Sequence, residues 1–219
     1  MIDPNLKPDT AVNPSDVCHR AFELIKQKQF DDAEKFLLGM MSKTQDSAAD
    51  ALYHSVLGVL YKVKGDFKAA WRHYSRAEKL LPNDPALKII SARLLIEQFA
   101  EYDSAIKKAK KVLQLLPGNP VFAHQAYITM GLAHGMKAEQ KKAIAMLEKS
   151  WGNDFEGFVT AKNIDFTLVE MLLKKDWGED ACFRFMNKAL GFAKNRKEEI
   201  FADAFQKMLD AFEKERHVD

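Results

Sequence analysis

Small and large apolar residues recur three and four positions apart in two neighbouring segments between Ala51 and Asp84. The first segment carries Leu57, Gly58 and Tyr61, and the second carries Ala70, Tyr74, Ala77 and Pro82. This spacing is typical of helices, and Lys64-Gly65-Asp66 provides a turn between them because glycine adopts positive φ at little cost. The pattern predicts two antiparallel helices that approach closely where Gly58 meets Ala70 and Ala77.

Weaker copies of the same pattern lie on both sides. The upstream copy keeps Ala21 and Ala33, and the downstream copy keeps Ala92 and Ala105 with one residue inserted in its turn. The fourth and fifth copies are marked by Tyr127, Gly131, His134, Ala143 and Leu147, and by Leu168, Val169, Leu172, Ala181 and Phe185. The fifth copy is degenerate, since Val169 occupies the close-contact place of glycine. We therefore expect a repeat of helix pairs.

Three dipeptides support this register. Asn13-Pro14, Asp84-Pro85 and Asn119-Pro120 each place a capping side chain before a proline that suits the first helical turn. They lie near multiples of one repeat apart, which apolar periodicity alone does not require.

The segment from Ala51 to Asp84 resembles the tetratricopeptide repeat (TPR), whose pattern is W-x2-L-G-x2-Y, then A-x3-F, then P. Only the tryptophan is missing, and His54 stands in its place. The resemblance implies an all-α fold, a right-handed α-solenoid of antiparallel helix pairs. It comprises four TPR-like repeats, a degenerate fifth pair and a C-terminal capping helix.

The expected organisation is an N-terminal tail at 1–12, four repeats at 13–150, and a degenerate fifth helix pair plus an amphipathic helix at 151–219. The last helix is predicted from about Lys197 to Arg216. Its apolar stripe consists of Ile200, Phe201, Phe205, Met208, Leu209 and Phe212, and acidic residues lie opposite. Such a helix would close the last open face of a solenoid.

Composition agrees with a folded helical protein. The 219 residues carry 33 Lys and Arg against 31 Asp and Glu, and only 10 glycines and 7 prolines. No apolar run reaches the roughly 18 residues of a spanning helix, and the first dozen residues lack a signal-peptide pattern. We expect a cytoplasmic protein without membrane insertion, and we interpret Cys18 and Cys182 as reduced, buried thiols.

Motifs of catalysis and of cofactor or metal binding were not found, which predicts no enzyme, no cofactor and no metal. We interpret His54 and His134 as packing residues in aromatic positions. We expect His73 on an exposed face and His124 just before a helix.

A basic stretch between Lys107 and Lys142 holds seven lysines and one acidic residue, Glu139. Its usual meaning is a solvated helix face, although an acidic partner could use it. Nucleic-acid binding is not predicted, because no aromatic platform is interleaved with the lysines and the net charge is only +2.

TPR arrays are generally protein-interaction modules in which the first helix of each pair lines a concave groove. The resemblance therefore implies a partner-binding groove of thirteen residues. They are Cys18, Phe22 and Ile25 in the first repeat, Leu52, Ser55, Val59 and Lys62 in the second, Ile89, Arg93 and Ile96 in the third, and Ile128, Leu132 and Met136 in the fourth. The carboxylate clamp of chaperone-binding TPR proteins is absent, since its positions hold residues such as Phe22, Val56 and Ile90.

An apolar groove of this size is seldom left exposed to solvent. It could be covered by a helix or extended apolar segment of another protein, by a second copy in a homodimer, or by the chain's own termini, including Ile2, Leu6 and Val12. The sequence favours a protein-binding adaptor or scaffold. The alternative is a self-associating structural subunit, or a chaperone for a secreted or assembling protein.

Overall fold

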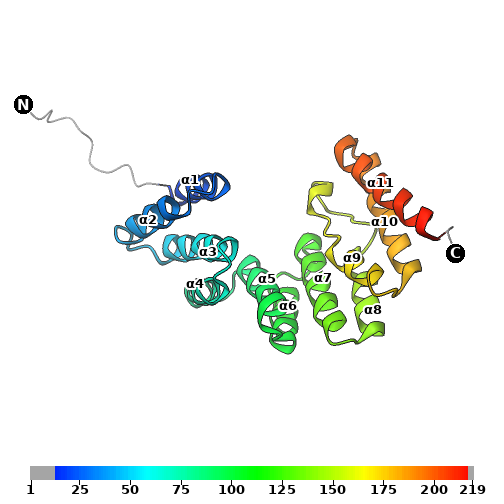
Figure 1. The fold of residues 1–219 in the computed structure, drawn as a ribbon, viewed down its shortest axis with the longest axis horizontal. Helices are drawn as coiled ribbons and strands as arrows, with labels where there is room; N and C mark the ends of the chain where they lie inside the picture. Colours follow the sequence, from blue (N-terminus) through cyan, green and yellow to red (C-terminus); the bar gives the residue numbers. More distant parts are fainter. Residues whose placement is uncertain (1–12, 217–219) are drawn as a thin grey trace, which may run out of the picture. The chain divides into compact units, whose positions relative to one another are not determined.

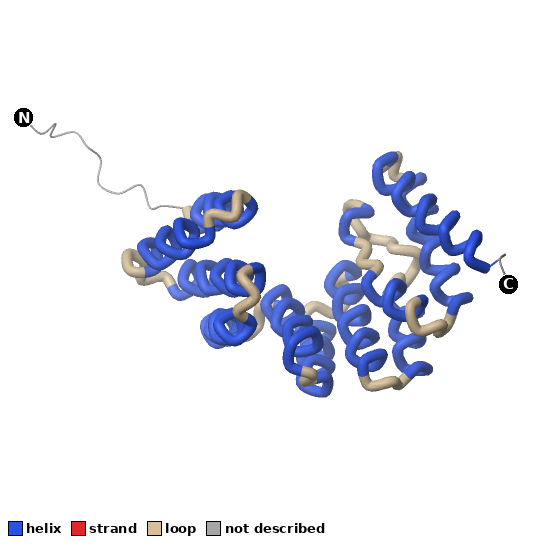
Figure 2. The backbone as a smooth tube through the Cα atoms, viewed as in Figure 1, coloured by secondary structure: helices blue, strands red, loops and turns tan. Residues whose placement is uncertain are grey.

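The computed structural model describes residues 13–216, so Ile2, Leu6, Val12 and His217 lie outside the described residues. Within this range the chain forms eleven α-helices and no strand (Figures 1 and 2). It divides into two compact units, unit 1 ending at Leu87 and unit 2 beginning at Lys88. Every helix in 13–216 is too short or too polar to cross a membrane.

Unit 1 consists of two helix pairs. They are α1 (Pro14–Lys26) with α2 (Phe30–Met41), and α3 (Ser47–Val63) with α4 (Phe67–Leu80). Helix α3 also packs against both helices of the first pair. Ala21, Leu37 and Leu57 are fully buried at the centre of the unit.

Unit 2 contains most of α5, the helix in which the boundary between the two units falls. Its elements are α5 (Pro85–Leu94), a π-helical turn η1 (Leu95–Phe99), α6 (Tyr102–Leu115), α7 (Pro120–Met136), α8 (Gln140–Ser150), a short 3-10 turn η2 (Ala161–Asn163), α9 (Thr167–Leu173), α10 (Glu179–Asn195) and α11 (Glu199–Arg216). Helix α7 packs against α6, α8 and α9, while α10 contacts α8, α9 and α11.

The three capping dipeptides act as expected. The side chain of Asn13 accepts a hydrogen bond from the Ser15 amide, and that of Asn119 accepts one from the Phe122 amide. Asp84 accepts from the Leu87 amide at 2.8 Å. These bonds satisfy amides that have no partner inside the helix, and they set the start of α1, α5 and α7.

One turn recurs between helices. The amide of Asp66 bonds to the Tyr61 carbonyl and that of Glu139 to the His134 carbonyl, five residues back in each case, around a left-handed residue, Gly65 or Ala138. After α5 the corresponding bond runs six residues back, from Glu101 to Leu95, and the π-helical turn η1 takes up the difference. The residue that the sequence places in this turn therefore extends the end of the first helix.

Replacing Ala138 with glycine should stabilise unit 2 by about 1 kcal/mol. Ala138 has φ 58°, a region that costs residues with a Cβ roughly 1–2 kcal/mol. Urea unfolding followed by circular dichroism measures the change, with Ala145→Gly inside α8 as a control that should lose about 1 kcal/mol. A loss of stability in both variants would contradict the prediction.

Gly58 lies where α3 meets α4, as the sequence predicts. A Cβ at Gly58 would stand 2.3 Å from Cε1 of Tyr74, so the tyrosine ring covers the glycine. Gly131 in α7 is covered in the same way by the side chain of Leu168 in α9. Glycine thus makes room for a large side chain from the facing helix.

Residues 151–166 form turns and loop, with the 3-10 turn η2, before the fifth helix pair begins (Figure 2). Gly152 and Gly157 both have positive φ, as do Asp154 and Phe155, and this backbone cannot continue an α-helix. Phe155 and Phe158 are nevertheless buried, each with edge contacts to other aromatic rings. The segment therefore contributes to the core of unit 2.

Candidate protein-binding surfaces

The predicted groove residues of unit 1 lie on α1 and α3 and differ in exposure. Phe22 and Leu52 are 42% and 41% exposed. Ile25 is buried in the core of the unit, and the Ser55 hydroxyl donates to the Leu52 carbonyl at 2.7 Å. The remaining predicted positions, Cys18, Val59 and Lys62, are half-buried.

The predicted groove residues of unit 2 are mostly covered. Ile128 is fully buried, so its side chain packs inside the unit and offers no surface. Ile96 and Leu132 are nearly buried, as is Ile89, and only Met136 is well exposed, at 45%. Arg93 is held in a polar network.

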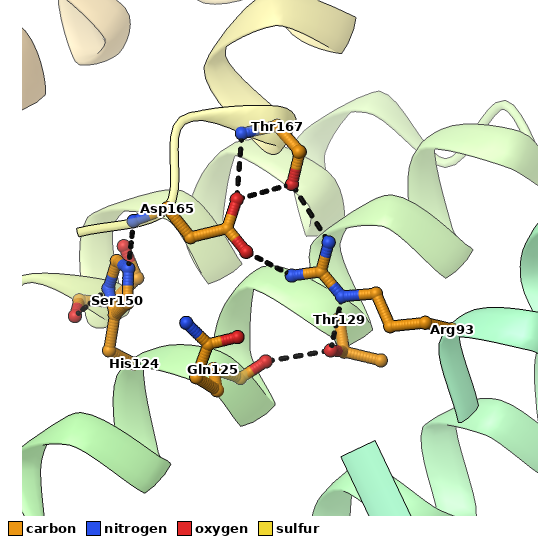
Figure 3. A network of polar contacts seen from close by, with 7 residues as sticks. All are labelled: Arg93, His124, Gln125, Thr129, Ser150, Asp165 and Thr167. Carbon is orange, nitrogen blue, oxygen red and sulfur yellow. Dashed lines mark hydrogen bonds and ion pairs between the residues drawn. The ribbon is translucent and has the colours of Figure 1, made fainter. Parts of the chain in front are cut away.

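The Arg93 network joins α5 to the segment that leads into α9 (Figure 3). One guanidinium nitrogen of Arg93 forms an ion pair with the Asp165 carboxylate, and another donates to the Thr167 hydroxyl at 3.0 Å. The Arg93 Nε donates to the Thr129 hydroxyl of α7 at 3.3 Å. All three donor nitrogens of Arg93 are therefore engaged within unit 2.

His124 extends this network inward. It lies inside α7, not before the helix as the sequence suggests, and it is fully buried. Its Nε2 accepts from the Asp165 amide at 2.9 Å, so Nδ1 carries the proton and donates to the Ser150 carbonyl at 2.9 Å (Figure 3). The histidine thus links α7, the end of α8 and the segment before α9.

The charges of the network are fixed by these contacts. Burial raises the pKa of the Asp165 carboxyl, but the Arg93 guanidinium and the hydrogen bonds from Thr167 outweigh it and hold that pKa below its usual value. Burial lowers the pKa of His124, and the bond to Ser150 opposes it only in part. At neutral pH the network therefore consists of one ion pair and a neutral imidazole, and these contacts hold α5, α7 and the segment before α9 together.

A pair of histidines lies in unit 1. His54 Nδ1 and His73 Nδ1 are 2.9 Å apart, and the ring of His73 stacks on Tyr61. His73 is therefore half-buried between two rings instead of lying on the expected exposed face. Burial and the neighbouring His54 lower its pKa to about 4, and burial lowers the pKa of His54 as well.

Unit 1 should lose stability as the pH falls below about 6.5, where the histidines of the unfolded chain take up protons that the folded pair does not accept. This loss should stop growing near pH 4, the folded pKa of His73. The urea concentration at the unfolding midpoint, measured at pH 7.5 and pH 5, gives the size of this loss. Between these two pH values the midpoint of the His54→Phe/His73→Phe variant should fall less than that of the wild type. An equal fall would show that the histidine pair does not cause the pH dependence.

The basic stretch is distributed over α6, the turn after α7 and the start of α8. Lys137 forms an ion pair with Asp103 at 2.6 Å, and Lys142 forms one with Glu139 at 3.1 Å. Lys107, Lys110 and Lys111 are exposed on α6.

No group of three or more histidine, cysteine or acidic residues in the described part of the chain is arranged to hold a metal ion. Cys18 and Cys182 are free thiols, and Cys182 is fully buried. Burial raises the pKa of Cys182 to about 12. A thiol in this state is unreactive.

No protein-family model matches the sequence, and no curated protein matches it. Solved structures do match. The chain is similar to PilW, described as a widely conserved type IV pilus biogenesis factor, with 13% identity, a TM-score of 0.63 and coverage of 92% of this chain and 94% of that one. It is also similar to TTC0263, a TPR protein of Thermus thermophilus, with 15% identity, a TM-score of 0.61 and coverage of 90% and 99%.

A further match is MamA from Desulfovibrio magneticus RS-1, with 18% identity, a TM-score of 0.56 and coverage of 85% of this chain and 98% of that one. Identities this low establish the fold alone. The matched structures agree with the all-helical fold of antiparallel pairs described above. The chain therefore has the tetratricopeptide-repeat fold, an all-α solenoid of antiparallel helix pairs.

Proposed function

We propose that this protein is a non-catalytic adaptor that binds an apolar or amphipathic segment of another protein on the first helices of its pairs. The observation that carries this proposal is the exposure of Phe22 and Leu52, each above 40%, on the neighbouring helices α1 and α3. Large exposed apolar side chains on neighbouring helices can anchor a partner's helix or extended segment. The half-buried Val59 lies two turns beyond Leu52 on α3 and continues this surface.

The fold supports protein partners in general, because the matched solved structures are TPR proteins. A fold does not fix a function, so the binding surface has to be argued from its own side chains. Since Ile128 is buried and Arg93 is engaged, the proposal places binding on unit 1 first. The cytoplasmic location remains a prediction from the sequence.

The double variant Phe22→Glu/Leu52→Glu should lose its partner, because two carboxylates would have to be buried against an apolar segment. Capture from native lysate with wild type and variant, followed by mass spectrometry, measures the loss. The matched control is Leu38→Glu/Val63→Glu, which changes two equally exposed apolar residues of unit 1, at 47% and 56%, outside the predicted positions. Circular dichroism verifies that both variants fold.

A protein captured by the wild type and the control, but not by Phe22→Glu/Leu52→Glu, supports the proposal. Equal capture by all three contradicts it. Light scattering tests the self-association alternative, since a homodimer that only the Phe22→Glu/Leu52→Glu variant converts to a monomer would identify a second copy as the occupant.

A further inference from the structure

A cleft of about 490 Å³ opens between α6, α7 and α8, away from the predicted groove residues. Its apolar lining comes from Leu113 of α6, Tyr127 and Met130 of α7, and Met146 of α8. Met130 is nearly buried, while Leu113, Tyr127 and Met146 are half-buried. A surface of this kind suits one or two apolar side chains of a ligand.

Lysines from two helices surround this apolar lining. Lys110 comes from α6, and Lys141, Lys142 and Lys149 come from α8. In the described part of the chain, Lys142 forms an ion pair with Glu139, whereas no ion pair of the cleft lysines Lys110, Lys141 or Lys149 is found. The cleft therefore combines an apolar lining with a net positive edge.

Glu139, the ion-pair partner of the cleft lysine Lys142, does not neutralise the cleft. Glu139 accepts hydrogen bonds from His134 at 2.5 Å and from Lys142 at 3.1 Å, and these bonds lower its pKa. Its single negative charge is thus already engaged. A ligand that carries carboxylates would complement the three remaining lysines and would be attracted over several ångströms.

We propose that this cleft binds an acidic segment of a partner protein, with an apolar side chain inserted between α6 and α8 and carboxylates on Lys110, Lys141 and Lys149. The surface is separate from Phe22 and Leu52 and does not depend on them. A peptide fits better than a nucleic acid. The cleft offers only two rings, Tyr127 and His134, and His134 is already hydrogen-bonded to Glu139. The lysines also gather around one cleft instead of following a strand.

The test is a selection of random dodecapeptides displayed on phage. The full chain is the bait, and the double variant Lys110→Glu/Lys149→Glu serves for counter-selection. Peptides retained by the wild type alone should contain two or more Asp or Glu beside a bulky apolar residue. Selected peptides without this composition, or no selected peptide at all, would overturn the proposal.

Fluorescence anisotropy of the best peptide then measures affinity. Lys110→Glu/Lys149→Glu should weaken binding on the order of tenfold or more, and about 1 M salt should weaken it as well. The control Lys68→Glu/Lys207→Glu makes the same charge change at exposed lysines of α4 and α11, and should bind within about twofold of the wild type. Equal weakening in both variants would show that only overall charge matters and would overturn the proposal.

Two further measurements separate the partner classes. Replacing the apolar residue of the peptide with alanine should also weaken binding about tenfold, because the side chain no longer fills the cleft. A single-stranded RNA that binds with the same dependence on Lys110 and Lys149, when no peptide does, would overturn the assignment to a protein partner. The Phe22→Glu/Leu52→Glu variant should bind the peptide normally, so this proposal can fail or stand independently of the adaptor proposal.

Discussion

Replacing Arg93 with leucine should lower the free energy of unfolding of unit 2 by about 3 kcal/mol, one of the two largest effects we expect. The change leaves the Asp165 carboxylate, whose side chain is only 16% exposed, without its cation. Removing one partner of a buried ion pair typically costs about 3–5 kcal/mol, because the other charge stays buried. Urea unfolding in a Trp71→Phe background reports on unit 2 through Trp151 and Trp177.

A double-mutant cycle provides the control. Asp165→Asn removes the charge but keeps an oxygen for the Thr167 hydroxyl, so Arg93→Leu/Asp165→Asn should lose less than the sum of the two single variants. A loss below about 1 kcal/mol in Arg93→Leu, the value of an exposed ion pair, would contradict the buried arrangement of Figure 3.

Gly58→Leu should destabilise unit 1 by about 2 kcal/mol. The new side chain would collide with the ring of Tyr74, which is itself only 1% exposed and has little room to move. Overpacking of this kind typically costs about 1–3 kcal/mol and sometimes more, which exceeds the roughly 0.8 kcal/mol that leucine gains over glycine in a helix. Thermal unfolding followed by circular dichroism measures the change.

Gly39→Leu is the matched control. Gly39 lies inside α2 with no neighbouring heavy atom within 4 Å of an added Cβ, so the same substitution should stabilise the protein slightly. An unchanged melting temperature in Gly58→Leu would show that α3 and α4 are not packed as described.

Local signals explain why α1 to α8 could be predicted from the sequence. A cap such as Asn119 and a turn such as Lys64-Gly65-Asp66 act within a few residues, so both can be recognised from the sequence alone. The expected single insertion after the third repeat's first helix was also correct in size. Its form, a π-helical turn, has no local signature in the sequence.

The candidate site could be predicted only in part, because exposure depends on packing between helices distant in sequence. The repeat pattern predicts Phe22 and Ile128 equally as groove residues. Phe22 is exposed, but Ile128 is fully buried because α7 packs against three other helices. The Arg93 network was missed altogether. Its ion pair joins residues 72 positions apart, and Asp165 lies in a loop that the repeat pattern does not cover.

The Arg93 network also bears on how the protein can be shortened. The repeat pattern suggests a minimal fragment that ends near residue 150, but such a fragment would remove Asp165 from Arg93 and leave Nε2 of the buried His124 without its donor. It would also remove Leu168, the side chain that covers Gly131. A fragment intended for expression should therefore continue at least through α9, because Asp165 and Leu168 complete the packing of the fourth helix pair.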